Sequence, residues 1–373
     1  MKINGIPYKT IWYDNPSGAI FIIDQTRLPH RFEVIGLNSL QDFCKAIATM
    51  QVRGAPLIGV TAAFGLALEL LRNPSMENEA KAAIDLLATR PTAVNLQWAI
   101  ERMRYAVSTV SFDMRGATAL SEAQKILDED IAKCADIGEH GLKLLESIYQ
   151  EKTVQSPLNI LTHCNAGWLA TVDWGTALAP IYKAHESGIP IHVWVDETRP
   201  RNQGASLTAW ELSQQGIEHT VIADNTGGHL MQNGLVDCCI VGSDRTTAKG
   251  DVCNKIGTYL KALAAYDNNI PFYVALPSST IDWKIDDGIK DIAIEQRDSR
   301  EVTHVSGLDK HGQITEVQLT ESPADANFAF DVTPAKFISA LITEFGLFDA
   351  NVTSLKQLKQ LLAPSDFISV NCV

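Results

Sequence analysis

Short apolar runs alternate with helical patterns from residue 158 onward. The strand-like runs lie at 158–162, 190–195, 219–223, 236–241, 271–276 and 327–331. Between most of them, apolar side chains recur at the spacing of an amphipathic helix. Strands that alternate with helices are typical of a parallel sheet covered on both faces. The pattern therefore predicts an α/β fold with a doubly wound parallel sheet.

The first part of the chain has a different pattern. Three short β-rich runs at 10–13, 19–24 and 31–35 predict a small β unit, and a helix is expected from Ser39 onward. Most of 77–148 also reads as helical.

A polar stretch at 150–157 separates the two patterns. We expect a domain boundary there, with a mostly helical N-terminal domain at 1–150 and a second domain at 151–373. Within the second domain, Gln296 to Glu321 is irregular and polar, and it predicts a surface loop or a small insertion.

Cys164 stands at a break in pattern. The apolar run 158–161 predicts a buried strand, the break falls at Thr162-His163-Cys164-Asn165, and a helical pattern follows Gly167. In doubly wound sheets, ligands bind at such strand ends. A thiol at the mouth of a crevice and near the free N–H groups of a helix start would have a lowered pKa and useful reactivity. The alternative is that Cys164 is simply a small buried hydrophobic residue.

Polar residues follow the other predicted strands as well. Asp196 to Ala205, Asp224 to Gly228, Gly242 to Arg245 and Pro277 to Thr280 would all face one crevice. Taken singly, Asp224 might only cap a helix and Asp196 might only pair with Arg199 on the surface.

Asp244 is the strongest acid/base candidate among these residues. It follows the buried run 238–241, and burial would raise the pKa of its carboxyl. The alternative is a structural salt bridge to Arg245.

Two arginines in the first domain precede predicted helices. Arg53 is followed by Gly54, which permits a close approach of a ligand, and by Pro56, which suits a first helical turn. A guanidinium beside free helix N–H groups forms an anion site. Arg90, in Arg-Pro-Thr-Ala, is a second candidate. For both arginines the alternative is a solvated side chain at a helix start.

Composition narrows the choice of partners. The net charge of −13 argues against nonspecific nucleic-acid binding. The longest apolar helix candidate, from Pro56, is interrupted by Thr61 and Glu69 and fits a core helix better than a membrane span. The seven cysteines show no zinc-site spacing, and the N-terminus shows no signal-peptide pattern. We therefore expect free thiols in the cytoplasm and no metal.

No G-x-G-x-x-G follows a predicted strand, and no P-loop occurs. The sequence therefore predicts a crevice that works without a cofactor. One cysteine, one or more aspartates, and Arg, Gln and Lys donors from both domains suit proton transfer on a small phosphorylated substrate.

Five motifs in order resemble the methylthioribose-1-phosphate isomerases of the methionine salvage pathway. They are Met50-Gln51-Val52-Arg53-Gly54-Ala55-Pro56, Arg90-Pro91-Thr92-Ala93, Thr162 to Gly167, Asp196 to Ala205, and Gly242-Ser243-Asp244-Arg245 with Gly250 to Thr258. The resemblance implies conversion of 5-methylthio-α-D-ribose 1-phosphate to 5-methylthio-D-ribulose 1-phosphate. It also implies a mostly helical N-terminal domain with a small antiparallel sheet, a Rossmann-like second domain and a homodimer.

The resemblance further implies the site residues. Cys164 and Asp244 match the catalytic pair of the family. Its substrate-binding set is matched by Arg53, Gly54, Ala55, Arg90, Gln203, Asn254 and Lys255. The anomeric phosphate prevents easy ring opening, so an acid must assist at the ring oxygen before hydrogen moves from C2 to C1. Asp244 is the better candidate for that acid, and Cys164 could assist it. A hydride shift in an apolar pocket is the rival route for the hydrogen.

The sequence departs from the family pattern near Asp244. Ser243 stands where alanine is common, and Thr246 to Lys249 replaces an apolar residue followed by Ala-Ala-Asn. Two other functions stay open. Ribose-1,5-bisphosphate isomerases share the Cys/Asp pair but need a second phosphate site. The regulatory subunits of the eukaryotic translation initiation exchange factor share the fold and act as binding modules.

Overall fold

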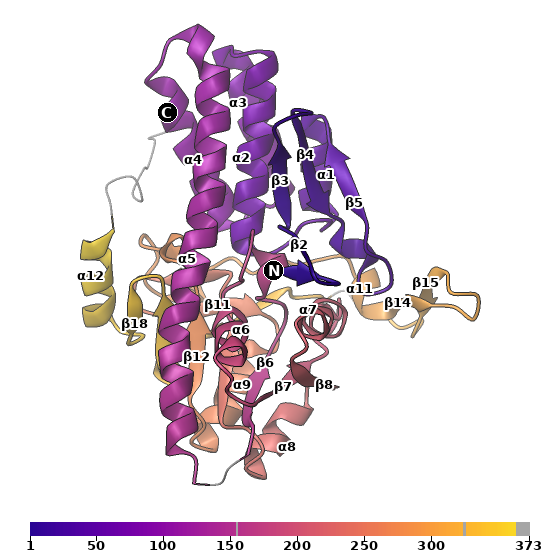
Figure 1. The fold of residues 1–373 in the computed structure, drawn as a ribbon, viewed down its shortest axis with the longest axis vertical. Coiled ribbons are helices and arrows are strands. Elements are labelled where there is room, and N and C mark those ends of the chain that lie inside the picture. The colour runs from indigo at the N-terminus through magenta and orange to yellow at the C-terminus, as the bar shows by residue number, and fades with distance from the viewer. Residues whose placement is uncertain (154–155, 324–325, 363–373) are drawn as a thin grey trace.

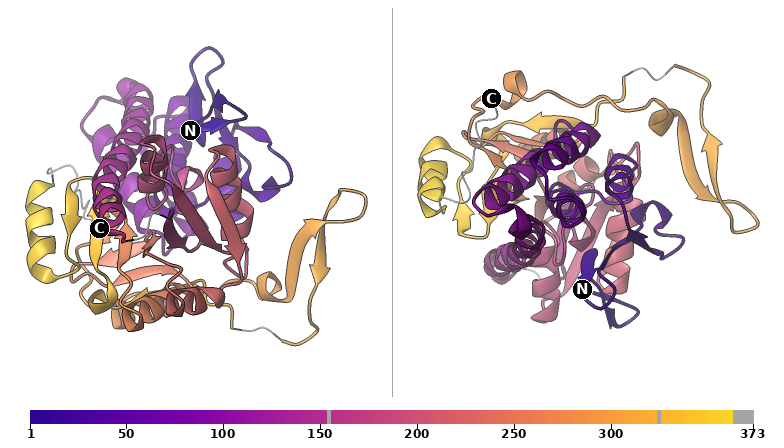
Figure 2. Two further views of the ribbon diagram at one scale, coloured as in Figure 1. Left: turned by 60° about the horizontal axis from the view of Figure 1, so that its bottom comes forward. Right: turned by 90° about the horizontal axis from the view of Figure 1, so that it is seen from above.

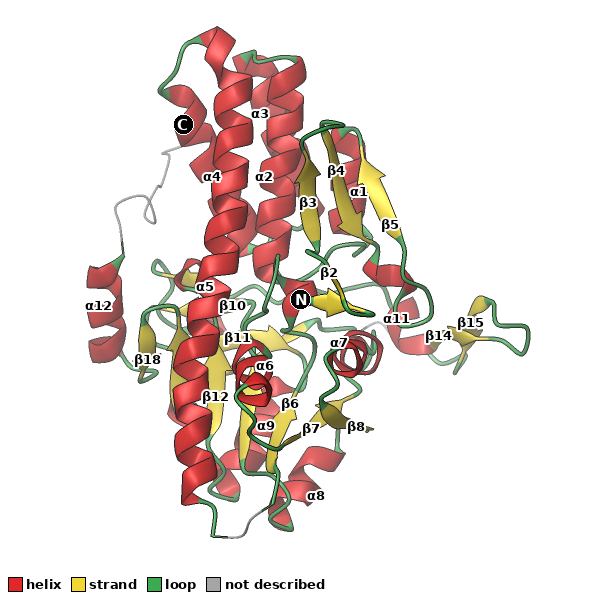
Figure 3. Ribbon diagram, in the orientation of Figure 1, coloured by secondary structure: helices red, strands yellow, loops and turns green. Residues whose placement is uncertain are grey.

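The computed structural model describes residues 1–153, 156–323 and 326–362. Figure 1 shows a helical region above a sheet region, with the long helix α5 (Arg115–Glu151) running beside both. Figure 3 shows that strands gather in the lower region and in one small sheet at the upper side.

The N-terminal region combines a small sheet with a helical bundle. The expected β unit is confirmed as an antiparallel sheet of β3 (Ile11–Asp14), β4 (Ala19–Ile23) and β5 (Val34–Leu37), after a short ladder of β1 (Lys2–Ile3) and β2 (Ile6–Pro7). The helices are α1 (Leu40–Ala48), α2 (Ala55–Arg72), α3 (Met76–Thr89) and α4 (Val94–Ser108). The helix expected from Ser39 onward is α1, and Ser39 caps it by accepting a hydrogen bond from the Asp42 N–H.

Helix α2 is the centre of the first core. It is long and apolar enough to cross a membrane by length and composition, but 72% of it is buried inside the protein. Leu57, Val60, Phe64 and Leu66 pack against α1, α3, α4 and α5. Its apolar character is therefore that of a core helix, as expected.

Helix α5 belongs to two cores. Ile126 and Leu127 pack in the first core, whereas Ile137 and Leu145 pack against the large sheet and α6 (Ala179–Glu186). The expected domain boundary falls where α5 ends, and residues 154 and 155 within it lie outside the described residues.

The large sheet has seven strands in the order β18-β17-β12-β9-β6-β7-β8. They are β6 (Leu158–Thr162), β7 (Ile191–Asp196), β8 (Glu218–Ile222), β9 (Cys238–Val241), β12 (Phe272–Ala275), β17 (Ala340–Thr343) and the antiparallel edge strand β18 (Gly346–Phe348). The doubly wound α/β fold is confirmed. Alternate residues of β6 and β9 enter cores on opposite faces, one with α5, α6 and α7 (Ala209–Gln214), the other with α8 (Thr226–Gln232), α9 (Thr258–Asp267) and α12 (Val352–Leu361).

For one strand, the sequence predicts the wrong sheet. The run 327–331 becomes β16 (Phe330–Thr333), which pairs antiparallel with β11 (Val252–Lys255) rather than joining the parallel sheet. The smaller sheet has the order β13-β10-β11-β16, with β13 (Ile281–Asp282) and β10 (Arg245–Thr247). Most of β16 is only half-buried, whereas β17 supplies a buried run beside β12. The apolar pattern of the sequence does not show how deeply each run is buried. It therefore does not distinguish a strand of the parallel sheet from a strand of the smaller sheet.

The segment from Gln296 to Glu321 is a surface insertion, as expected, but it is partly regular. After α10 (Gly288–Asp291) it forms α11 (Arg300–Thr303) and a hairpin of β14 (His304–Leu308) and β15 (Ile314–Gln318). Figure 2 shows in both views that this hairpin projects away from the body of the protein.

Two glycines on α5 permit a matched test of its contact with α6. A Cβ at Gly141 would lie 2.2 Å from Cγ of Pro180, a rigid ring, whereas a Cβ at Gly138 would lie 2.8 Å from the flexible Lys183 chain. We expect Gly141→Ala to lower the free energy of unfolding by about 1–2 kcal/mol through overpacking. Gly138→Ala should leave it unchanged or raise it by up to about 1 kcal/mol, because alanine favours helices. Urea unfolding measures both. Equal effects of the two substitutions would contradict this account of the α5–α6 contact.

Candidate active site

Cys164 lies in a tight turn after β6 rather than at a helix start. Its φ is +64°, a value that non-glycine residues seldom adopt. Its backbone N–H donates to Oγ1 of Thr198 at 2.8 Å, and its carbonyl accepts from Oγ1 of Thr208 at 2.7 Å. The helix expected after Gly167 is wrong: only one 3₁₀ turn, Trp168–Ala170, follows, and α6 begins at Ala179. Buried loop residues, with an apolar content like that of a helix, fill the gap.

Strained backbone conformations cluster around this turn. Thr198 and Asn202, both in the loop after β7, have φ values of +65° and +55°. A β-branched residue such as threonine is especially unfavourable there. Three such residues side by side are held by the surrounding hydrogen bonds, and strain of this kind concentrates at functional sites.

Glu211 holds the segment that follows Cys164 in place. Its buried carboxylate accepts hydrogen bonds from the N–H groups of Trp168 and Leu169, both at 2.9 Å. It also accepts from the side-chain amide of Asn165 at 2.9 Å and from the hydroxyl of Tyr182 at 2.7 Å. This single carboxylate therefore occupies the backbone N–H groups after the turn, so they are not free to face the Cys164 thiol.

Arg53 reaches the same turn from the first domain. Its guanidinium donates to the carbonyl of Asn165 at 2.7 Å and also contacts the Asn165 side-chain oxygen. Gly54 has a φ of +99°, and a Cβ there would lie 2.3 Å from the carbonyl oxygen of Ala170. Only glycine permits this approach, which brings the start of α2 against the turn.

The strand ends converge on one cavity, as predicted. The cavity measures about 30 Å³ and is lined by residues from α2, the Cys164 turn, the end of β9 and β11; these include Arg53, Gly54, Ala55, Cys164, Asp244 and Asn254. Gln203 lies beside it, because its Oε1 is 3.4 Å from Sγ of Cys164. A larger cavity of about 510 Å³ adjoins it through Arg53 and is lined by Gln203 and the base of the projecting hairpin.

Asp244 has the expected raised pKa. Burial raises the pKa of its carboxyl, and the neighbouring cations Lys255 and Arg53 oppose that rise. The alternative salt bridge is wrong, because Arg245 lies 3.5 Å from Asp282 instead. Asp244 is thus a carboxyl that keeps its proton more readily than usual.

The pKa of Cys164 moves in the direction opposite to expectation. Burial raises the pKa of the thiol, and the opposing effects of Arg53 and Lys255 are smaller. The physical reason is that the turn is buried and no helix begins there. Cys164 therefore holds its proton at neutral pH and has the character of a proton donor rather than of a thiolate nucleophile.

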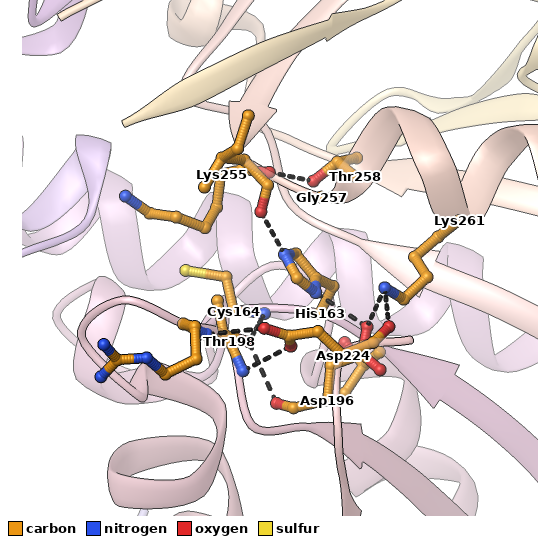
Figure 4. A network of polar contacts seen from close by, with 12 residues as sticks. His163, Cys164, Asp196, Thr198, Asp224, Lys255, Gly257, Thr258 and Lys261 are labelled. Atoms are coloured by element: carbon orange, nitrogen blue, oxygen red, sulfur yellow. Dashed lines mark hydrogen bonds and ion pairs between the residues drawn. The ribbon is translucent and has the colours of Figure 1, made fainter. Parts of the chain in front are cut away.

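His163 anchors the floor of the site (Figure 4). Its Nε2 is 2.8 Å from the carbonyl oxygen of Ile256, which can only accept, so Nε2 carries a proton. Its Nδ1 is 2.8 Å from Oδ2 of Asp196, and Lys261 lies 3.2 Å from the same oxygen. Asp196 is fully buried, so its expected surface ion pair with Arg199 is wrong.

Asp224 also serves a different purpose from helix capping. Its two carboxylate oxygens accept from the N–H groups of Thr198 and Arg199 at 2.7 and 2.8 Å. Asn225, not Asp224, precedes α8. His163, Asp196 and Asp224 place ligand atoms within 4.8 Å of one another. They do not fit a metal site, because backbone N–H groups hold Asp224 and the Lys261 ammonium already neutralises Asp196.

The remaining predicted residues lie around the cavity. Asn254 and Lys255 are buried on β11, and Lys255 lies close enough to Cys164 and Asp244 to alter the pKa of each. Arg90 is not among the cavity-lining residues and instead forms an ion pair with Glu295 at 2.9 Å. Of the two departures from the family pattern, Ser243 lines the cavity and contacts Oγ1 of Thr246, whereas Lys249 pairs with Asp286 on the surface.

The sequence does not point to the residues that hold the Cys164 turn. His163 and Asn165 stand in the motif Thr162 to Gly167, but the motif alone does not indicate their contacts. A lone carboxylate between the apolar neighbours Trp210 and Leu212 is a signal that Glu211 is buried. Arg297 lies in the segment Gln296 to Glu321, whose composition reads as surface, and Glu295 immediately precedes that segment.

Comparison with known proteins agrees with the resemblance. Residues 51–350 match the model of the initiation factor 2 subunit family. The methylthioribose-1-phosphate isomerase of Rhodospirillum rubrum is 60% identical over 371 residues, covering 98% of this chain and 95% of that protein. The chain belongs to the methylthioribose-1-phosphate isomerase family. The Escherichia coli O45:K1 isomerase is 56% identical over 96% of each chain.

Solved structures of two family members have the same fold. The 5-methylthioribose 1-phosphate isomerase of Pyrococcus horikoshii is 38% identical, covers 95% of this chain and 97% of its own, and has a TM-score of 0.82. Translation initiation factor eIF-2B, subunit delta, from A. fulgidus is 39% identical, covers 94% and 100%, and has a TM-score of 0.75. The helical N-terminal region and Rossmann-like sheet are therefore shared by the isomerases and by initiation-factor subunits.

The role of Glu211 can be tested by removing its charge. In Glu211→Gln, the amide nitrogen cannot accept, so at least one of the four donors loses its partner. We expect a loss of about 1–3 kcal/mol in the free energy of unfolding. Tyr182→Phe, which removes only one of the donors, is the matched control and should cost less. Urea unfolding measures both, and a Glu211→Gln protein as stable as wild type would contradict the assignment.

The protonation state of Cys164 can be tested by alkylation. Burial raises the pKa of the Cys164 thiol above its ordinary value. At pH 7.5, iodoacetamide should therefore alkylate Cys164 more slowly than it alkylates free glutathione. Mass spectrometry of digested protein, sampled over time, measures the rate at each cysteine. Fast modification with an inflection below pH 8 would show a thiolate and contradict the proton-donor character.

Proposed function

We propose that the chain isomerises 5-methylthio-α-D-ribose 1-phosphate to 5-methylthio-D-ribulose 1-phosphate by acid-assisted ring opening. The observation that carries the proposal is the shared cavity of Cys164 and Asp244, whose pKa values burial raises, beside the cations Arg53 and Lys255. The curated relatives named methylthioribose-1-phosphate isomerase support it over nearly the full chain.

The phosphate would lie at the start of α2. The first N–H groups of a helix lack intrahelical partners, and those of Gly54 and Ala55 border the cavity. Arg53 precedes them directly and supplies a planar guanidinium suited to phosphate oxygens. Asn254 and Lys255 approach from β11, so the phosphate would be held from both halves of the protein.

Asp244 would protonate the ring oxygen. Its raised pKa means that a useful fraction stays protonated at a pH where an ordinary aspartate is ionised. Cys164, also protonated, would assist as a second acid/base, held toward Gln203 by its 3.4 Å contact. Hydrogen transfer from C2 to C1 follows, either through an enediolate or as a hydride shift. Running the reaction in D₂O separates the two routes, because only an enediolate exchanges with solvent.

The two other functions lead to different observations. A ribose-1,5-bisphosphate isomerase needs a second phosphate site, and Arg201, Arg297 and Arg300 around the larger cavity would each have to exchange a glutamate partner to form one. A regulatory binding module needs no acid/base pair in a cavity. We also propose, from the family resemblance and the composition, a cytoplasmic homodimer. Assaying both sugar phosphates by NMR tests the function, and turnover of neither would favour the binding module.

The catalytic pair can be tested by Cys164→Ala and Asp244→Asn. Each should lower kcat by about 10²–10⁴-fold, the usual contribution of a positioned acid or base, while circular dichroism and urea unfolding stay near wild type. Cys44→Ala, at a free cysteine on α1 outside the site, is the control and should keep full activity. Near-normal turnover by either site variant would show that its role is wrongly assigned.

A further inference from the structure

Glu295 lies between two arginines, Arg90 and Arg297, of which Arg297 lines the larger cavity. Its Oε2 is 2.9 Å from Nη2 of Arg90, and its Oε1 is 2.8 Å from Nη1 of Arg297. The side chains of Arg90 and Glu295 are only 10% and 18% exposed. Nε of Arg90 is buried and has no hydrogen-bond partner among the described residues. The guanidinium of Arg90 therefore has donor capacity that Glu295 leaves unused.

The ion pair joins the two halves of the protein across the crevice. Arg90 follows α3 in the helical region. The carbonyl of Glu295 accepts from the N–H of Ala329 at 2.9 Å, immediately before β16. Since β16 pairs with β11, Glu295 is attached to the sheet that carries Asn254 and Lys255. Any ligand held by residues of both halves must accommodate this contact.

Both members of the pair act on catalytic groups. Burial is the largest cause of the raised pKa of Asp244, but Arg90 lowers that pKa and Glu295 raises it. The pKa of Lys255 is lowered chiefly by burial, and Arg297 and Arg90 contribute to the same decrease. The pair therefore lies within electrostatic range of Asp244 and Lys255.

The cavity of Cys164 and Asp244 is too small by itself for a sugar phosphate. Its 30 Å³ leaves room for only about one or two water molecules. A phosphate monoester carries nearly two negative charges and three acceptor oxygens, against one charge and two oxygens on a carboxylate. A phosphate would therefore outcompete Glu295 for Arg90, and Arg297 would keep Glu295 neutralised after the exchange.

We propose that Glu295 is the counter-ion that holds Arg90 in the substrate-free protein and that the substrate phosphate displaces it. The inference rests on the proposed function, in which Arg53 holds the phosphate at the start of α2, and it adds Arg90 as a further ligand of that phosphate. Glu295 is a positioning residue: it touches no reacting atom and acts on substrate affinity through Arg90.

Isothermal titration calorimetry of the full chain with inorganic phosphate tests the proposal. Glu295→Gln keeps the side-chain size and removes the competing charge. We expect phosphate to bind about threefold to tenfold more tightly, with a lower KM for the sugar phosphate and a smaller change in kcat. In an Arg90→Ala background, Glu295→Gln should leave phosphate affinity unchanged, because there is nothing left to compete for.

Glu69→Gln is the matched control for charge alone. Glu69 pairs with Arg72 on α2, and neither residue lines either cavity, so its loss should leave phosphate binding as in wild type. Unchanged or weaker phosphate binding in Glu295→Gln overturns the proposal, and so does a gain that persists without Arg90 or that Glu69→Gln reproduces.

The design also separates this inference from the proposed function. Phosphate binding is measured without turnover, so a wild-type protein that binds phosphate but does not isomerise the sugar refutes only the function. If Glu295→Gln fails to fold, as urea unfolding would show, Glu295→Asp withdraws the carboxylate from Arg90 and should tighten phosphate binding in the same direction.

Discussion

The buried carboxylate of Glu211 is the constraint on which the site depends. Four donors converge on it, and two of them are backbone N–H groups of the segment that follows Cys164. A segment without regular structure has to place its backbone groups somewhere, and inside a core water is not available. Glu211 accepts hydrogen bonds from those backbone groups and from the Asn165 side chain. Asn165 in turn accepts from Arg53, and Arg53 brings the start of α2 to the cavity. The position of Cys164 is thus a consequence of a chain of polar contacts that crosses from one half of the protein to the other.

This arrangement explains how a thiol and a carboxyl have raised pKa values beside several cations. Lys255 and Arg53 favour the charged forms of Cys164 and Asp244, but burial outweighs them at both groups. The cations are then available to hold a phosphate, while the two acids remain available for a ring oxygen. Charge neutralisation and proton donation are divided between different residues in one small cavity.

The sequence predicted the elements with regular periodicity and the residues with distinctive chemistry. Five parallel strands, the small antiparallel sheet and the helix at Pro56 follow from hydrophobic spacing, and the convergence of Cys164 and Asp244 follows from the rule that strand ends meet. Three features could not be predicted. The loop after Gly167 is apolar because it is buried, and its apolar residues resemble the pattern of a buried helix. The strand at 330–333 pairs across a different sheet, which is a long-range choice. Glu295 meets Arg90 more than 200 residues away, and charge spacing along the chain carries no information about such a contact.

Helix α5 has a consequence for how the protein is made. Its first half packs in the helical core, but Ile137 and Leu145 belong to a core whose strands lie later in the chain. During synthesis, the second half of this ~55 Å helix must wait, with its apolar face uncovered, until the strands from β6 to β12 have left the ribosome. The nascent chain therefore exposes this apolar face while more than a hundred further residues are translated. The same helix that joins the two cores of the finished molecule leaves an apolar face uncovered in its unfinished form.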